Sequence, residues 1–240
     1  MEIVSIFCCY NEIKLLPIRK KWCDFEGIKM AMADNHSDDG SYEWGKKNCD
    51  YTCRINTNDA FDLAKLQKGK EEMMHHIKPD QIIKGGVDTF LFADIPLKEI
   101  IKKSKGYDII ECDLLEIYNT GEQSESIADY FYYQLHTKKV GFIHRYMNCE
   151  YIADDYDKQY KRIYFENLVC LNYGGIKSSK ERNRTYERRK KAWKAGMHPG
   201  WGVHYIEGHK RNWIWDKSEL QDLRQSRYWY FLKDKLNLLK

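Results

Sequence analysis

The 240-residue chain has a formal net charge of +4 at pH 7, and 42% of its residues are hydrophobic. This composition supports a packed core and excludes a disordered chain, and the charge excess is weaker than nucleic-acid-binding domains usually carry. No apolar run is long enough for a membrane span, the first residues do not resemble a signal peptide, and the eight cysteines read as reduced core thiols. We therefore expect one large cytoplasmic domain, with no transmembrane segment and no nucleic-acid partner.

Through the first ninety residues the hydrophobic pattern predicts alternating strands and helices. Apolar runs predict strands over 2–10, from 28, over 51–57 and over 81–93, and helical spacing predicts helices over 11–27, 41–48 and 59–77. Strands that alternate with helices form parallel sheets covered on both faces, and these sheets bind ligands at the carboxyl ends of their strands. We therefore look for functional residues at those ends.

Beyond residue 96 the pattern is less regular. We expect a helix over 96–106, strands over 107–118 and 165–173, a strongly basic helix over 178–196 and a last helix that starts at a Ser218 cap. Charge runs are mostly solvated helix faces, so we expect the basic helix to be solvated. The alternative is that it attracts an anionic donor, nucleic acid or membrane phosphates.

Three short motifs stand at or near predicted strand ends. They are Tyr10, Asn11 and Glu12 in "CYNE", Asp34 in "DNHSDDGS" and Asp88 in "GVDTFL". In this order they resemble the family 2 glycosyltransferases of the GT-A fold. In that family a first strand ends in Tyr-Asn-Glu, a second ends in Asp followed by Asn-x-Ser-x-Asp-Gly, and an Asp-x-Asp motif comes next. The resemblance covers the first half of the chain and resumes at "HPGWGVHY".

The resemblance implies an α/β chain of the GT-A class, with a mostly parallel central sheet flanked by helices and a helical C-terminal extension. Residues 1–118 would bind the donor, 119–215 would form the acceptor half with a metal and phosphate loop, and 216–240 would form the C-terminal helix. The implied activity is transfer of a sugar, with inversion, from a nucleotide-sugar donor to a hydroxyl of a glycan or other acceptor, as in polysaccharide biosynthesis. Peripheral association with a membrane is compatible with that activity.

The same resemblance implies roles for individual residues. The expected donor-binding residues are Tyr10, Asn11, Glu12, Asp34, Gly86, Lys210 and Arg211. Asp88 and His204 are the expected ligands of a Mn²⁺ or Mg²⁺ ion, with His198 as a competing imidazole. Such an ion would neutralise the leaving diphosphate as a Lewis acid.

An inverting transferase also needs a general base to accept the proton of the acceptor hydroxyl. We expect Asp155, with Asp154 beside it, and the rivals are Glu111 and Asp113. The sequence departs from the family at Gly86, which stands where the first Asp of Asp-x-Asp would be. The main alternative is therefore a non-catalytic nucleotide- or sugar-binding module with a degenerate motif, and a second alternative is a nucleic-acid-binding protein that uses the basic helix.

Overall fold

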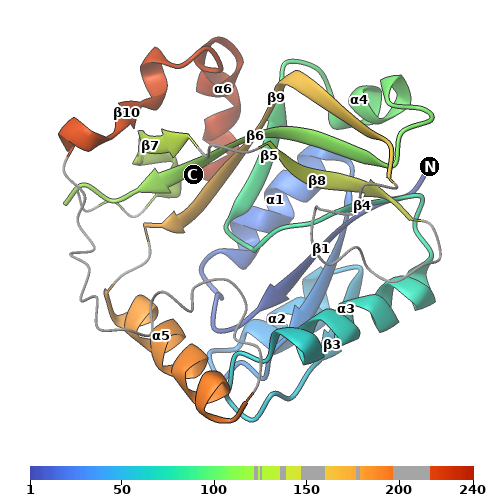
Figure 1. Ribbon diagram of the computed structural model, residues 1–240, viewed down its shortest axis with the longest axis vertical. Helices are drawn as coiled ribbons and strands as arrows, with labels where there is room; N and C mark the ends of the chain where they lie inside the picture. The colour runs from blue at the N-terminus through green and yellow to red at the C-terminus, as the bar shows by residue number, and fades with distance from the viewer. Residues whose placement is uncertain (122–123, 125, 136–138, 147–159, 177–178, 197–216) are drawn as a thin grey trace.

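The computed structural model describes residues 1–121, 124, 126–135, 139–146, 160–176, 179–196 and 217–240. Within these residues ten strands form one sheet, with helices on both of its faces (Figure 1). No helix of this described part is long and apolar enough to cross a membrane.

The first half of the chain forms the parallel part of the sheet. Its strands are β1 (Ile3–Cys9), β2 (Lys29–Asp34), β3 (Tyr51–Arg54) and β4 (Gln81–Ile83), and its helices are α1 (Leu16–Glu26), α2 (Ser41–Asn48) and α3 (Leu63–Ile77). The order in the sheet is β3-β2-β1-β4, and all three pairings are parallel. The chain thus moves outward from β1 to β3 and then returns to the other side of β1. This reversal places a topological switch point between β1 and β4.

Each face of β1 packs against a different helix, as strand alternation requires. Val4 and Ile6 share a buried cluster with Met73 and Met74 of α3. Phe7 belongs to the larger cluster of the opposite face, which also contains buried residues of α1. The ends of α1 follow the sequence signals: Pro17 lies in its first turn, and Gly27 ends it in the left-handed conformation at φ 63°.

Residues 81–93 form two strands, and the expectation of one strand there was wrong. β4 ends at Ile83, and β5 (Thr89–Ala93) runs antiparallel to β9 (Arg162–Gly175). The chain turns between them, with Gly85 at φ 148° and a hydrogen bond from the Thr89 N–H to the Gly86 carbonyl of 3.2 Å. The two glycines permit this turn because they lack a Cβ.

The second half of the chain widens the sheet with mainly antiparallel strands. These are β6 (Ile109–Tyr118), β7 (Tyr132–Leu135), β8 (Val140–Arg145) and β10 (Gln221–Asp222), and β9 lies parallel to β6. The remaining α-helices are α4 (Leu97–Lys103), α5 (Ser179–Lys194) and α6 (Trp229–Lys235). Short 3-10 turns occupy Ile127–Asp129, Lys217–Glu219, Leu223–Gln225 and Leu236–Leu239. The expected α/β class, with central parallel strands flanked by helices, is confirmed.

The C-terminal extension is helical only in part, and the continuous helix expected from Ser218 is not formed. β10 pairs with β7 at Gln221 and Asp222, and the Leu223 N–H donates to the Phe131 carbonyl at 2.7 Å. These sheet contacts are incompatible with helical backbone, so α6 begins only at Trp229.

A buried carboxylate, Asp113 on β6, holds this extension against the sheet. It is 4% exposed and accepts hydrogen bonds from Lys139, from the Tyr228 hydroxyl and, at 2.8 Å, from Arg227. Burial alone would raise the pKa of Asp113, but the hydrogen bonds from Lys139, Tyr228 and Arg227 and the charge of Lys139 together hold the pKa below its ordinary value. Asp113 is therefore a charged anchor.

Replacing this anchor by an amide should loosen the extension. The side chains of Lys139 and Arg227 are 46% and 47% exposed, so water screens the lost charge. We expect Asp113→Asn to cost about 1–2 kcal/mol, less than the 3–5 kcal/mol of a fully buried pair. A lowered carboxyl pKa stabilises the fold above the unfolded value near 3.9, and this contribution is lost as pH falls through the folded value.

Urea unfolding of the parent and of Asp113→Asn from pH 7 to pH 3 measures this effect. The difference between the two proteins should be largest at pH 7 and should shrink in acid. Glu99→Gln, which removes only the exposed pair with Lys102, is the matched control and should change the free energy of unfolding by less than about 0.5 kcal/mol. Equal effects of the two substitutions would contradict an anchoring role for Asp113.

Candidate functional site

The candidate site lies outside the carboxyl ends of β1, β2 and β4. Residues 10–12 follow β1, residues 35–40 follow β2 and residues 84–88 follow β4. Because β1 and β4 flank the topological switch point, their carboxyl ends form the position where open α/β sheets place ligands. Helix α5 lies beyond these strand ends, beside the α2–β3 part of the sheet (Figure 1).

Asn11 joins the loops that follow β1 and β2. Its backbone has φ 57°, its N–H donates to the Ser37 Oγ at 2.9 Å and its side-chain Nδ2 donates to Asp38 at 2.7 Å. The Asp38 N–H returns a bond to the Asn11 Oδ1 at 2.9 Å. The Glu12 N–H donates to the Ser41 Oγ at 3.2 Å, at the start of α2. Asn11 therefore fixes the relative position of the two loops.

Asp34, the last residue of β2, is completely buried. Its Oδ2 accepts from the Ser37 N–H at 3.1 Å and from the Arg54 Nε at 3.3 Å. Its other oxygen, Oδ1, is buried and has no hydrogen-bond partner among the described residues. A buried acceptor without a donor is costly, so this oxygen has unused binding capacity.

Helix α5 places three cations, Arg184, Arg188 and Lys191, towards these loops. Arg188 is 6% exposed, its guanidinium carbon lies 3.3 Å from the centre of the Tyr10 ring, and it donates to the Ala60 carbonyl at 3.0 Å. Burial lowers the pKa of Arg188. Most described side chains of the basic helix are exposed, as expected, and Arg188 is the buried exception among its cations. The signal in the sequence for the face that meets the loops is the helical spacing of the three cations.

Two carboxylates from the strand loops meet the cations of α5. Arg184 lies 3.2 Å from Asp38, and Lys191 lies 3.7 Å from Asp59, which also accepts a 2.7 Å bond from the Tyr10 hydroxyl. The hydrogen bonds from Arg184 and then Asn11 hold the pKa of Asp38 below its ordinary value. Three cations of α5 thus lie against two carboxylates of the strand loops. These ion pairs were not predicted from the sequence, because they join residues far apart in the chain that no motif contains.

Asp88 lies in the turn before β5, 9% exposed, and its carboxylate covers two glycines. A Cβ on Gly86 would lie 2.3 Å from the Asp88 Oδ1, and a Cβ on Gly174 would lie 3.4 Å from its Oδ2. The space beside Gly86 is therefore filled by Asp88 itself. An aspartate at residue 86 would displace the Asp88 side chain instead of adding a carboxylate beside it.

Arg19 of α1 supports this turn from inside the core. It is completely buried, donates to the Thr89 carbonyl and donates to the Ser5 Oγ at 2.6 Å. The rings of Phe7, Trp22 and Phe90 surround its guanidinium at 4.5–5.6 Å. Arg19 therefore fixes the start of β5 and, with it, the position of Asp88.

The other expected site residues are divided between two groups. Asp154, Asp155, His204, Lys210 and Arg211 lie outside the described residues, as does His198. Of the rival bases, Asp113 is held by the C-terminal extension, and Glu111 pairs with Arg162 at 2.9 Å. Within the described part of the chain, no three His, Cys, Asp or Glu side chains form a group that could hold a metal. Of the expected metal ligands, only Asp88 belongs to the described residues.

Comparison with known proteins returns structural similarity only. No family model and no curated protein matches the sequence. S. aureus TarS in complex with UDP-GlcNAc is 11% identical, with 83% of this chain and 68% of that chain covered, at a TM-score of 0.43. HddC from Yersinia pseudotuberculosis complexed with GMP-PN is 11% identical, with 71% and 92% covered, at 0.41. The bifunctional IspDF from Campylobacter jejuni is 13% identical, with 69% and 50% covered, at 0.42.

Against three other TarS structures, this chain covers only 40%, 47% and 41% of the length of the TarS chain. The TM-scores of all these structures lie below 0.5. The candidate site therefore rests on the topology and side-chain geometry of this chain alone.

Loss of the buried cation Arg188 should detach α5 from the strand ends. In Arg188→Met the ring contact with Tyr10 and the bond to Ala60 are both removed. We expect amide hydrogen exchange within α5 to accelerate at least about tenfold, which corresponds to about 1.4 kcal/mol of lost anchoring energy. Lys194→Met, an exposed position of the same helix, is the control and should leave exchange unchanged. The same exchange rate in both variants would show that α5 is anchored by other contacts.

Proposed function

We propose that this chain is a GT-A-like glycosyltransferase that binds a nucleotide-sugar donor at the carboxyl ends of β1, β2 and β4. The observation that carries the proposal is the switch point between β1 and β4, with the Tyr10–Glu12 loop on one side, the Asp88 turn on the other and the cations of α5 beyond. Open α/β sheets bind nucleotides at such points. Arg184 and Lys191 of α5 are exposed cations that an anionic donor could reach.

In this proposal Asp34 recognises the nucleoside. Its Oδ1 lacks a donor among the described residues, and an N–H of the base or a ribose hydroxyl would satisfy it. Tyr10, Asn11 and Glu12 would frame the same pocket through the loop that Asn11 ties to the β2 turn.

The diphosphate would be held by the cations of α5. The side chains of Arg184 and Lys191 are 43% and 55% exposed, and each now pairs with a single carboxylate. A diphosphate offers more charge and more acceptor oxygens than one carboxylate, so charge-assisted hydrogen bonds to it would be stronger. Lys210 and Arg211 remain predicted partners of the same group.

A Mn²⁺ or Mg²⁺ ion would be held by Asp88, with His204 as its predicted second ligand. Mg²⁺ sites in phosphate-transferring proteins commonly use one or two carboxylates and complete their shell with phosphate oxygens and water, so a single carboxylate at this turn fits the ion. The ion would supply charge neutralisation at the leaving diphosphate. Asp155, with Asp154 beside it, remains the predicted base that accepts the proton of the acceptor hydroxyl.

The second candidate function is a nucleotide- or sugar-binding module without catalysis. It is favoured by Gly86, because the Asp88 carboxylate occupies the space where a second motif carboxylate would stand. Hydrolysis or transfer of UDP-, GDP- and dTDP-sugars by the pure protein with Mn²⁺ separates the two candidates. Donor turnover supports the transferase, and nucleotide binding without turnover supports the module. A nucleic-acid-binding role is disfavoured, because the sequence contains no recognisable nucleic-acid-binding motif.

Nucleotide binding should depend on Asp34 even without metal. In Asp34→Asn one buried acceptor oxygen is replaced by an amide that offers donors in its place. We expect the Kd for the preferred diphosphate among UDP, GDP and dTDP to rise about tenfold in calorimetry without divalent ions. Asp24→Asn, on the exposed end of α1, should leave the Kd unchanged. An unaltered Kd in a folded Asp34→Asn protein would remove Asp34 from the site.

The metal requirement should depend on Asp88. We expect Mn²⁺ to tighten diphosphate binding in the parent protein, because the ion links the carboxylate to the phosphates. Asp88→Asn should abolish that gain and leave the metal-free affinity within about twofold. The same titrations with and without Mn²⁺ measure both quantities. If Mn²⁺ has no effect on the parent protein, the phosphates are held by side-chain cations alone and the metal assignment fails.

A further inference from the structure

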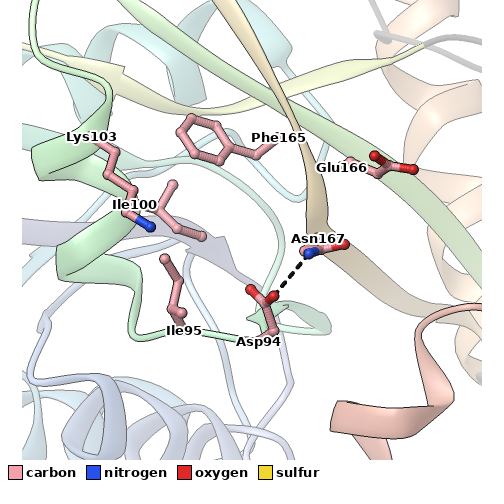
Figure 2. A pocket seen from close by; sticks show the side chains of 7 residues that line it. All are labelled: Asp94, Ile95, Ile100, Lys103, Phe165, Glu166 and Asn167. Atoms are coloured by element: carbon pink, nitrogen blue, oxygen red, sulfur yellow. Dashed lines mark hydrogen bonds between the residues drawn. The ribbon is translucent and has the colours of Figure 1, made fainter.

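A pocket lies at the opposite edge of the sheet. β5 starts at the Asp88 turn and runs away from the switch point, so Asp94, just after β5, lies at the amino edge. This pocket of about 190 Å³ is lined by the middle and end of α4, the β5–α4 link and β9 (Figure 2). It is smaller than the 300–1,000 Å³ typical of drug-sized ligands, so it suits a single small ring.

The pocket combines an apolar surface with one polar pair. Ile95, Ile100 and the Phe165 ring form the apolar part, and Asp94 and Asn167 lie across from them (Figure 2). The Asn167 Nδ2 donates to the Asp94 Oδ2 at 2.8 Å, which holds the two planar groups together. Because side chains alternate along β9, Phe165 and Asn167 share one face.

Glu166 lines the pocket, but its carboxylate points away from Phe165 and Asn167 (Figure 2). Its Oε1 instead accepts from Arg227 at 2.8 Å. The charges that face the pocket are therefore one anion, Asp94, and one cation, Lys103.

These polar groups have unused hydrogen-bonding capacity. The Asp94 Oδ2 accepts from both Asn167 and, at 3.3 Å, the Tyr230 hydroxyl. Among the described residues nothing donates to the Asp94 Oδ1 or to the Asn167 Oδ1, and nothing pairs with the Lys103 ammonium. Two acceptors and one cationic donor thus surround an apolar surface, with no net charge.

We infer that this pocket binds one neutral, hydroxyl-rich ring, such as a single sugar residue of a glycan. Hydroxyl groups supply the donors that Asp94 and Asn167 lack, and they accept from Lys103. The apolar C–H face of a pyranose fits against the Phe165 ring and the two isoleucines. The paired charges favour a neutral ligand over an organic anion. This inference does not rest on the proposed function, since its residues are at the other edge of the sheet.

Isoleucine methyl groups report on this pocket directly. In protein labelled with ¹³C at isoleucine methyls, Ile95→Val and Ile100→Val identify the two reporter signals. The methyl glycosides of glucose, galactose, mannose and N-acetylglucosamine are the neutral probes, and benzoate is the anionic probe with a flat ring. We expect at least one glycoside to shift both signals saturably, and more tightly than benzoate does.

Asn167→Leu should weaken that glycoside about tenfold, because it removes the hydrogen bond to the Asn167 Oδ1 and the Asn167 bond that holds Asp94 in place. Glu99→Gln, which removes an exposed carboxylate of α4 outside the pocket lining, is the control and should retain the parent affinity. Benzoate binding that is tighter than every glycoside, and that is lost in Lys103→Met, would identify an organic-anion site and overturn the inference. No shift of either signal with any glycoside at tens of millimolar would overturn it as well. Nucleotide titrations are separate, so either proposal can fail alone.

Discussion

The position of the candidate site depends on one buried cation, Arg19. Moving a guanidinium into a protein core is costly unless hydrogen bonds and charges compensate. Here the hydroxyl of Ser5 on β1 and the carbonyl of Thr89 on β5 compensate, together with three aromatic rings. Burial lowers the pKa of Arg19, and the negative charge of Asp88 is among those that oppose this shift. The same cation therefore joins α1, β1 and β5 and keeps Asp88 at the switch point.

A second set of charges operates outside the core, where α5 meets the strand loops. Asp38 and Asp59 belong to loops that the parallel sheet positions, and the cations of α5 reach them from far along the chain. An anion that enters this region competes with those carboxylates for the same cations. The free energy that holds α5 in place is thus subtracted from the binding energy of any anionic ligand, and ligand binding and helix position are coupled.

Much of the first half of the fold could be predicted from the sequence. Apolar runs predict β1 and β2, and Pro17 and Gly27 set the ends of α1, because these signals act between neighbours in sequence. The strand expected over 81–93 failed because hydrophobic periodicity does not detect a reversal within an apolar run. The Gly85–Gly86 pair was the available signal for that turn. The extension after Ser218 failed for another reason: long-range pairing with β7 and Asp113 overrides local helical preference.

The positions of candidate site residues could be predicted only where a sequence motif stands at the end of a predicted strand. Asn11 and Asp34 stand at the ends of predicted strands, so topology alone brings them to one edge. Asp88 lies inside the strand expected over 81–93, and the turn that places it at this edge was not predicted. The contacts of these residues could not be predicted from the sequence. Asn11 joins the loops after β1 and β2, and the Asp88 carboxylate fills the space beside Gly86. The sheet thereby separates two groups of polar side chains. Its carboxyl edge carries the loops of Asn11 and Asp34 with the cations of α5 against them, and its amino edge carries the pocket beside Asp94. The antiparallel turn into β5 is what places them at opposite ends of one strand.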